Sequence, residues 1–322
     1  MPPTDLLAEF SRKCAAKGRL FEAQIELTHR CNLRCLHCYI HHASLPPESA
    51  VENWKATLDQ LVDMGLCMVT FTGGEPLLHP GLEELIAHAF GKGCQVRIFS
   101  NANLFQDKAH VDRLRTAGLC YLETSIYGAN ADSHDAITLV PGSFEKTLRA
   151  VRWCQEAGIA VTMKTSWMKQ NWREYPRVVA LAREWGVFFR GSPSLMPRLD
   201  GDLANQDHGM SYEELVEFYS MDESNAAPRE TGADSSGDTL DAPPCGIARL
   251  SMAISPAGDA YPCLHMRVPF ANVFRDDIKE RWAHAPELQR YRQITLRSFE
   301  PCRECDMRRF CFVCMGDGWL EW

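Results

Sequence analysis

Short apolar runs alternate with amphipathic stretches along residues 21–190 of the 322-residue chain. Runs rich in β-branched and aromatic side chains predict strands, and longer stretches with apolar residues on one face predict helices. The predicted strands are 21–28, 68–72, 95–100, 121–127, 160–165 and 187–190, and the predicted helices are 48–64, 81–92, 106–117, 144–157 and 173–185. Repeated βα units of this kind imply a parallel sheet with right-handed crossovers. Six units are too few for a closed eight-stranded barrel, so we expect an open, partial barrel.

The second part of the chain has a different pattern. SYEE at the start of 211–220 is a capping-box sequence and predicts a short helix. A linker is predicted at 221–242, and after it we expect a hairpin at 250–262 and two short helices around 276–293. The acidic linker is rich in Ser, Gly, Ala and Pro, which predicts flexibility. The predicted division is an N-terminal extension (1–20), a partial barrel (21–220), a flexible linker (221–242) and a small cysteine-rich α+β domain (243–322).

Composition and charge bear on location and partners. Hydrophobic residues make up 45% and charged residues 24% of the chain, which is ordinary for a globular protein. The formal net charge of −8 argues against a general surface for nucleic acid or anionic membrane. No apolar run approaches the roughly 20 residues of a spanning helix, and the N-terminus lacks a secretory-signal layout. We therefore expect a cytoplasmic protein that binds neither nucleic acid nor membrane.

Fourteen cysteines are many for such a chain, and in a reducing cytosol clustered cysteines indicate metal ligation. Nine fall into two groups: Cys31, Cys35 and Cys38, and then Cys245, Cys263, Cys302, Cys305, Cys311 and Cys314. The other five are expected to be small packing residues: Cys14, Cys67, Cys94, Cys120 and Cys154. Cys67, Cys94 and Cys120 lie at the N-terminal ends of predicted strands, whereas the chemistry of α/β barrels gathers at the C-terminal ends of strands.

The first group lies in LTHRCNLRCLHCYI, directly after the first predicted strand. Three thiolates can hold three corners of a [4Fe–4S] cluster and leave one iron without a protein ligand. A structural zinc site would need a fourth ligand, for which His37, His41 and His42 are available. The second strand ends in FTGGEP, where Gly73 and Gly74 are expected to let the backbone approach a ligand closely. A zinc knuckle gives no reason for that stretch.

CNLRCLHCY followed by GGEP resembles the radical S-adenosylmethionine (SAM) superfamily. The resemblance implies a partial (β/α)6 barrel and a [4Fe–4S] cluster whose open iron binds the amino and carboxylate groups of SAM. An electron from a low-potential donor of the flavodoxin or ferredoxin type then gives a 5′-deoxyadenosyl radical, which abstracts hydrogen. The implied cluster ligands are Cys31, Cys35 and Cys38, and the implied SAM contacts are Tyr39, Gly73, Gly74, Glu75, Pro76, Ser100, Asn101, Ser125 and Thr165.

The same resemblance suggests what these contacts do. The GGEP residues would line the amino group of SAM, mainly through their backbone. Ser100 and Asn101, which end the third strand, match the ribose and carboxylate region. Ser125 and Thr165 are expected on the same side, although such residues also serve as barrel-core or capping residues. Tyr39, directly after the last cysteine, is expected near the adenine, and His37 needs no catalytic role.

The second cysteine group has two parts. Cys245-x12-Gly258-x4-Cys263 fits a tight hairpin turn that brings the two cysteines together. Two CxxC pairs follow, and a zinc ribbon would use only four of the six thiols. The pattern resembles the SPASM extension of radical SAM enzymes, or its shorter twitch variant, which holds auxiliary iron–sulfur clusters. That resemblance assigns Cys245, Cys263 and Cys314 to a first site and Cys302, Cys305 and Cys311 to a second.

The group departs from a full SPASM domain, which has a further cysteine beyond the CxxC pairs. Only MGDGWLEW follows Cys314, which also fits a shortened chain end. Six thiolates cannot give each of two clusters four ligands. Either two clusters each keep a non-thiolate or open position, for which Asp306, Asp317 and His265 are candidates, or one four-cysteine cluster leaves two thiols spare.

Radical SAM enzymes with such extensions frequently modify ribosomally made peptides by crosslinking, epimerisation or oxidation. The sequence therefore predicts a radical SAM enzyme of peptide maturation, without indicating a catalytic acid or base. One alternative is a radical SAM enzyme acting on a small molecule or tetrapyrrole, as a dehydrogenase or decarboxylase. Another is a non-catalytic Fe–S or zinc protein, which GGEP and SNA disfavour.

Two features bear on how a peptide would be recognised. The first twenty residues are too few for a fused leader-recognition domain, so a separate recognition protein is expected. RGSPSLMPRLDGD at 190–202 and the linker lie where a lid over a peptide could form, and a disordered connection fits them equally.

Overall fold

The computed structural model describes residues 9, 13–14, 17–40, 45–221, 239–241, 243–304 and 314, without the side chains of 301 and 302. The strands are β1 (Glu22–Thr28), β2 (Met68–Gly73), β3 (Gln95–Ser100), β4 (Leu119–Ser125), β5 (Ala160–Ser166), β6 (Phe188–Ser192), β7 (Ser251–Ile254), β8 (Asp259–Tyr261) and β9 (Ala271–Asn272). The helices are α2 (Val51–Asp63), α3 (Leu82–Gly91), α4 (Lys108–Ala117), α5 (Ala131–Thr138), α6 (Ser143–Glu156), α7 (Tyr175–Glu184), α8 (Tyr212–Ser220), α9 (Ile278–His284), α10 (Pro286–Gln293) and α11 (Glu300–Arg303).

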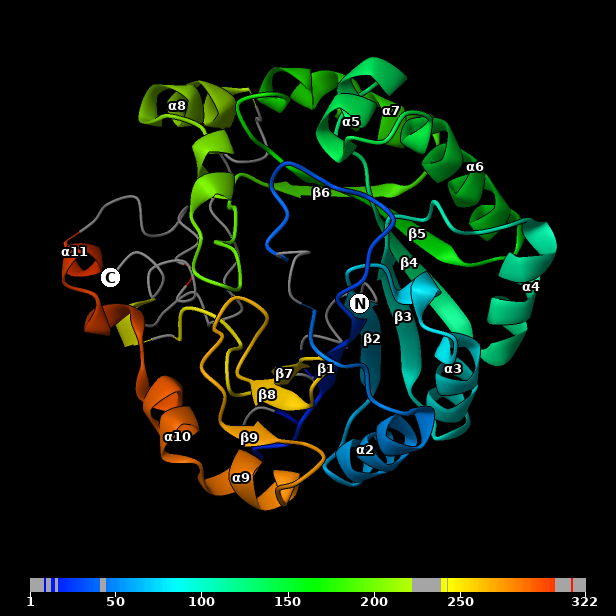
Figure 1. Cartoon of the computed structure of the whole chain (residues 1–322). Helices are drawn as coiled ribbons and strands as arrows, with labels where there is room; N and C mark the ends of the chain where they lie inside the picture. The colour runs from blue at the N-terminus through cyan, green and yellow to red at the C-terminus, as the bar shows by residue number, and fades with distance from the viewer. Residues whose placement is uncertain are drawn as a thin grey trace.

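In the described residues the strands form one nine-stranded sheet, in the order β6-β5-β4-β3-β2-β1-β7-β8-β9. Strands β1 to β6 pair in parallel, and helices α2 to α7 form an arc on the outer side of this curved sheet (Figure 1). The α/β fold with a partial parallel barrel is therefore confirmed.

Strand β1 shows how the sequence sorts its side chains. Ala23, Ile25 and Leu27 are fully buried and pack in the main hydrophobic core with α2 residues such as Leu58. Because successive side chains of a strand point to opposite faces, the alternate residues of β1 face the barrel interior. Glu26 is one of these, and it is fully buried. The interior is therefore lined with polar groups that need partners.

The predicted capping box and hairpin turn are confirmed, and glycines with positive φ angles stand between helix and strand in the barrel. The glycines that precede β2 to β5 have positive φ angles of 105°, 88°, 118° and 72°, at Gly65, Gly93, Gly118 and Gly158. The capping box of α8 is present, with Ser211 and Glu214 each accepting the other's backbone N–H. Gly258, with a φ of +87°, closes the turn between β7 and β8.

Helix α5 was not predicted from the sequence. Its segment, ADSHDAIT, lacks an apolar stripe, and the helix begins instead at Asn130, whose side chain accepts the N–H of Ser133 at 3.1 Å. The fourth strand begins two residues earlier than predicted, at Leu119.

The C-terminal hairpin continues the barrel sheet. Strand β7 pairs in parallel with β1, from Glu22–Ser251 to Ile25–Ile254, and β8 and β9 follow as antiparallel strands. The predicted linker 221–242 lies largely outside the described residues, as does most of the extension 1–20. The domain boundaries therefore stay predictions. Among the described residues, none of the helices combines the length and apolar character that a bilayer crossing requires.

All five isolated cysteines lie in helical residues, in a strand or directly before a strand, and all are buried or half-buried, as expected for packing residues. Cys154 is fully buried on the core face of α6, and burial raises the pKa of its thiol to about 12. The thiols of Cys67 and Cys120 donate to the carbonyls of Gly65 and Val96, at 3.3 and 3.1 Å. These contacts lie at the N-terminal ends of β2 and β4, away from the first cysteine group.

Candidate functional site

The first cysteine group lies in the loop that follows β1, and the structure brings its three thiols together. Each is half-buried, and Cys35 lies close enough to both others for their negative charges to affect its pKa. Burial is the main effect and raises the pKa of Cys31 to about 11 and the pKa of Cys35 further. Such thiols stay protonated unless a metal takes the place of the proton.

The surroundings of this loop fit a cluster bound by thiolates. The sulfur of Cys31 accepts the N–H of Leu33 at 3.4 Å and the Nδ2 group of Asn101 at 3.6 Å. Hydrogen bonds to sulfur are one of the ways in which a protein tunes an iron–sulfur cluster. The buried Nδ1 atom of His37 has no hydrogen-bond partner among the described residues, as at a site completed by a bound group. His41 and His42, the other zinc candidates, lie outside the described residues.

The two glycines of GGEP let two backbones meet. A Cβ on Gly73 would lie 2.1 Å from the carbonyl oxygen of Thr28, and a Cβ on Gly74 would lie 2.2 Å from that of Arg30. Gly74 and Glu75 donate their N–H groups to these two carbonyls, at 2.7 and 2.8 Å. The glycines thus allow a close approach to the start of the cysteine loop, and their expected approach to a ligand stays a prediction.

Glu75 organises the ends of β2 and β3. Its carboxylate is fully buried and accepts hydrogen bonds from Ser100 Oγ at 2.7 Å, Asn101 N at 2.8 Å and Leu77 N at 3.1 Å. Burial raises the pKa of Glu75 to about 7, although these donors oppose the shift. Ser100, expected at the ribose of SAM, directs its hydroxyl to Glu75. Its contact with SAM, like that of every other residue predicted to bind it, stays a prediction.

Two further predicted contacts lie on the barrel strands. Thr165 is buried, and its hydroxyl donates to the carbonyl of Ile126 at 2.5 Å, so it serves the packing of β5. Ser125 ends β4 and is half-buried. Between these strands the buried carboxylate of Glu123 lies 3.2 Å from Lys164 Nζ and 3.8 Å from Arg190 Nη1. Both cations are well exposed.

Asn205 is a loop-positioning residue that the sequence did not reveal. Its fully buried amide donates to the carbonyl oxygens of His37 at 3.2 Å, Cys38 at 3.5 Å and Met196 at 2.7 Å. It thereby ties the stretch after β6 to the cysteine loop. A single asparagine in a polar segment carries no sequence signal for such a role.

Helix α5 supports the loop from another side. Its last residues offer the carbonyl oxygens of Ile137 and Thr138 to the N–H groups of Leu36 and Arg34, each at 3.1 Å. The helix missed in the sequence is therefore part of the frame that holds the cysteines.

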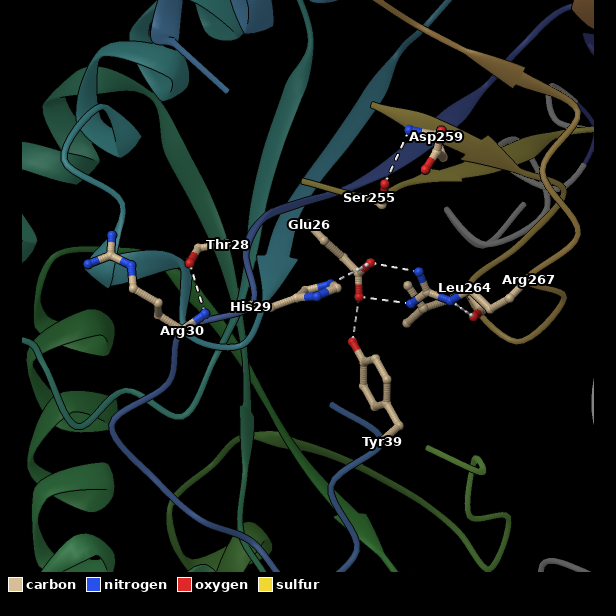
Figure 2. Close-up of polar contacts among 9 residues, drawn as sticks. All are labelled: Glu26, Thr28, His29, Arg30, Tyr39, Ser255, Asp259, Leu264 and Arg267. Atoms are coloured by element: carbon tan, nitrogen blue, oxygen red, sulfur yellow. Dashed lines mark hydrogen bonds and ion pairs between the residues drawn. The ribbon is translucent and has the colours of Figure 1, made fainter. Parts of the chain in front are cut away.

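A buried ion pair connects β1 to the C-terminal part of the chain. Arg267 Nη1 and Nη2 lie 2.7 and 2.8 Å from the two carboxylate oxygens of Glu26 (Figure 2). Tyr39, the residue after Cys38, donates its hydroxyl to the same carboxylate at 2.7 Å, and His29 Nε2 lies 3.3 Å away. Burial alone would raise the pKa of Glu26, but Arg267 and these hydrogen bonds hold it well below its usual range.

The second cysteine group is described in part. Cys245, Cys263 and Cys314 lie close enough for the negative charges of Cys245 and Cys314 to affect the pKa of Cys263, which burial chiefly raises to about 11. This is the trio assigned to one auxiliary site. The side chain of Cys302, and all of Cys305, Cys311, Asp306 and Asp317, lie outside the described residues. Among the described residues, the first cysteine group included, no three His, Cys, Asp or Glu side chains lie close enough together to hold a single metal ion.

Comparison with known protein families identifies the family to which this chain belongs. Residues 25–182 match the radical SAM superfamily, and residues 245–306 match SPASM, an iron–sulfur cluster-binding domain. The chain belongs to the radical SAM superfamily. With its SPASM domain it is a radical SAM enzyme that uses a [4Fe–4S] cluster, SAM and auxiliary iron–sulfur clusters.

Among similar proteins, the PqqA peptide cyclase of Granulibacter bethesdensis is 29% identical over 299 residues, covering 88% of this chain and 79% of the relative. An AdoMet-dependent heme synthase of Methanosarcina barkeri is 26% identical over 313 residues, covering 90% and 89%. The structure of Streptococcus suis SuiB bound to the precursor peptide SuiA has a TM-score of 0.66 at 17% identity, covering 96% of this chain and 76% of SuiB. This last likeness shows a shared fold.

The contact between GGEP and the radical SAM cysteine loop predicts a large effect of a single methyl group. Gly73→Ala and Gly74→Ala should each lower the free energy of unfolding by about 1–3 kcal/mol, because the new Cβ meets rigid backbone. Gly91→Ala is the matched control, since a Cβ at this last residue of α3 has open space around it. It should raise the free energy of unfolding by roughly 0.5–1 kcal/mol. Urea unfolding measures all three, and a Gly73→Ala protein as stable as its parent would contradict the contact.

The Glu75 carboxyl predicts a pH dependence of stability. Its pKa is about 7 in the folded protein, against 4.5 for an ordinary glutamate. Glu75 therefore contributes stability that is fully present below pH 4.5 and is lost as the pH rises through 7. Glu75→Gln removes this titration. The amide N–H group that it introduces faces the three donors to the carboxylate, so the variant is less stable than the parent at every pH. Relative to the parent, the variant should gain stability between pH 5 and pH 8 in urea unfolding; a constant difference would show that Glu75 does not titrate there.

Proposed function

We propose that this radical SAM enzyme modifies a ribosomally synthesised peptide, by crosslinking, epimerisation or oxidation. The observation that carries the proposal is the open edge of the barrel sheet. Strand β6 is the end strand of the sheet in the described part of the chain, and its last three residues, at the end of the strand nearer the cysteine loop, are exposed. An edge strand presents unpaired N–H and C=O groups, and an extended peptide can pair with them. A tetrapyrrole has no backbone to pair in this way.

The similar proteins support a peptide substrate without deciding it. PqqA peptide cyclase and the SuiB structure with its precursor peptide are named for peptides. The heme synthase is named for a tetrapyrrole, and it is nearly as similar to this chain. Conversion of a tetrapyrrole is therefore the outcome against which the peptide proposal is tested.

Residues of this chain have distinct places in the proposed chemistry. Cys31, Cys35 and Cys38 would hold the cluster that, with SAM, supplies a 5′-deoxyadenosyl radical. The GGEP stretch, Asn101 and the other predicted contacts would hold SAM. The Glu123 face with its two cations would meet the substrate inside the barrel.

The auxiliary site and the partners complete the proposal. Cys245, Cys263 and Cys314 would hold one auxiliary cluster, with Cys302, Cys305 and Cys311 at a second. A flavodoxin- or ferredoxin-type protein would supply electrons, and a separate protein would recognise the leader of the peptide.

The test is an anaerobic assay of the protein reconstituted with iron and sulfide. SAM, a reductant and the peptide encoded next to this gene should give 5′-deoxyadenosine and a change in peptide mass. Cys35→Ala should abolish both products, because it removes a cluster ligand. Cys67→Ala is the matched control, and it should retain activity because Cys67 lies at the opposite end of the barrel strands.

The outcomes separate the alternatives. 5′-Deoxyadenosine that depends on an iron tetrapyrrole and not on the peptide would overturn the peptide proposal and leave the radical SAM assignment intact. No 5′-deoxyadenosine above that of Cys35→Ala would contradict the assignment of the cluster ligands.

A further inference from the structure

The Glu26–Arg267 pair joins residues 241 positions apart, one in each matched domain. Glu26 is fully buried on β1 and the Arg267 side chain is 15% exposed, so both charges are removed from water. Removing two charges from water is expensive, and apolar residues of similar volume often give equal or greater stability. Stability alone therefore does not account for a charged pair at this place.

One end of the pair belongs to the auxiliary site. Arg267 follows Cys263 by four residues, and its Nε donates to the carbonyl of Leu264 at 2.8 Å. In the same turn, Met266 donates its N–H to the sulfur of Cys263 at 3.3 Å. The position of the guanidinium is thus set by the turn that carries the auxiliary thiol.

The other end belongs to the loop of the radical SAM cysteines. Tyr39 follows Cys38 directly, and its hydroxyl donates to the carboxylate that Arg267 binds (Figure 2). The guanidinium also lies 5.7 Å from the centre of the Tyr39 ring, within the range of a cation–π contact. Arg267 therefore contacts the ring of Tyr39 directly, and it contacts the Tyr39 hydroxyl through the carboxylate of Glu26.

Sheet pairing does not make this connection. Strand β7 pairs with β1 only over residues 22–25, so the pairing ends at the residue before Glu26. The chain from Glu26 to the cysteine loop is thus tied to the C-terminal domain through the ion pair.

We propose that Glu26 and Arg267 are positioning residues that link the auxiliary site at Cys263 to the SAM-binding loop. The pair holds Tyr39, and with it the Cys38 end of the loop, in the position that binds SAM. The proposal rests on the assignment of Cys38 and Cys263 as cluster ligands and not on the identity of the substrate.

The test is a double-mutant cycle in the reconstituted full chain, with Arg267→Met, Glu26→Gln and the double variant. Three quantities are measured under anaerobic conditions: bound iron, the melting temperature, and the SAM concentration that half-changes the EPR signal of the reduced cluster. Arg267→Met leaves Glu26 as an unpaired buried charge and should lower the melting temperature. The double variant removes both charges and should recover that temperature.

SAM binding should not recover with stability. Arg267→Met and the double variant should each need about tenfold more SAM, a loss of about 1.4 kcal/mol in binding, because neither holds Tyr39 to the Cys263 turn. Tyr39→Phe keeps the ion pair and removes only the hydroxyl contact, so it should weaken SAM binding in a protein that folds normally. Cys263→Ala should weaken it as well, through the other end of the link.

Arg292→Met is the matched control. Arg292 lies in the same domain, donates to the carbonyls of Ala248 and Trp282 at 2.7 Å each, and lies over the Trp282 ring. Its loss should lower the melting temperature and leave the SAM response unchanged.

Two results would overturn the proposal: an unchanged SAM response in Arg267→Met and Tyr39→Phe, or a response that recovers with the melting temperature in the double variant. A SAM-responsive signal that persists in Cys38→Ala would instead show that the ligand assignment itself is wrong. Peptide modification enters none of these measurements, so failure of the proposed function would not be mistaken for failure of this link.

Discussion

A negative charge buried inside the barrel must be neutralised, and this constraint shapes the centre of the molecule. The alternation of β1 that buries Ile25 and Leu27 against the helices also turns Glu26 inward. The cation comes from the far end of the sequence, in the turn after Cys263. The barrel and the C-terminal domain therefore meet through a bidentate contact with one favourable geometry, beyond the end of the β1–β7 pairing.

Several different kinds of contact hold the loop of the radical SAM cysteines in place. GGEP fixes its start through backbone contacts that only glycine permits, α5 and Asn205 hold its middle, and Tyr39 holds its end. A loop that supplies ligands to a cluster gains from such support, because sites are more precise when the surrounding residues lock their positions. The thiols of this loop are half-buried, and burial raises their pKa values, so their ionisation is coupled to metal binding.

Patterns with a local physical cause could be predicted from the sequence, and long-range pairings could not. The βα alternation predicted the partial barrel, and the resemblance of the second cysteine group to the SPASM extension placed Cys245, Cys263 and Cys314 in one site, where the structure brings them close together. Helix α5 was not predicted because it has no apolar stripe, and its only local signal is the N-cap residue Asn130. The ion pair of Glu26 was not predicted because no motif near Arg267 in the sequence indicates that it pairs with a residue 241 positions away. Gly73 and Gly74 stood out in the sequence, but their close contact with the Thr28 and Arg30 backbone is long-range and could not be predicted.

The central claim is that a residue of the SPASM domain positions the radical SAM loop. Hydrogen–deuterium exchange of the reconstituted protein tests it directly, because it reports local opening segment by segment. Arg267→Met should speed exchange in residues 29–40 as well as around residue 267, whereas Arg292→Met should change exchange only in its own domain. Faster exchange confined to residues 245–304 in both variants would contradict the account.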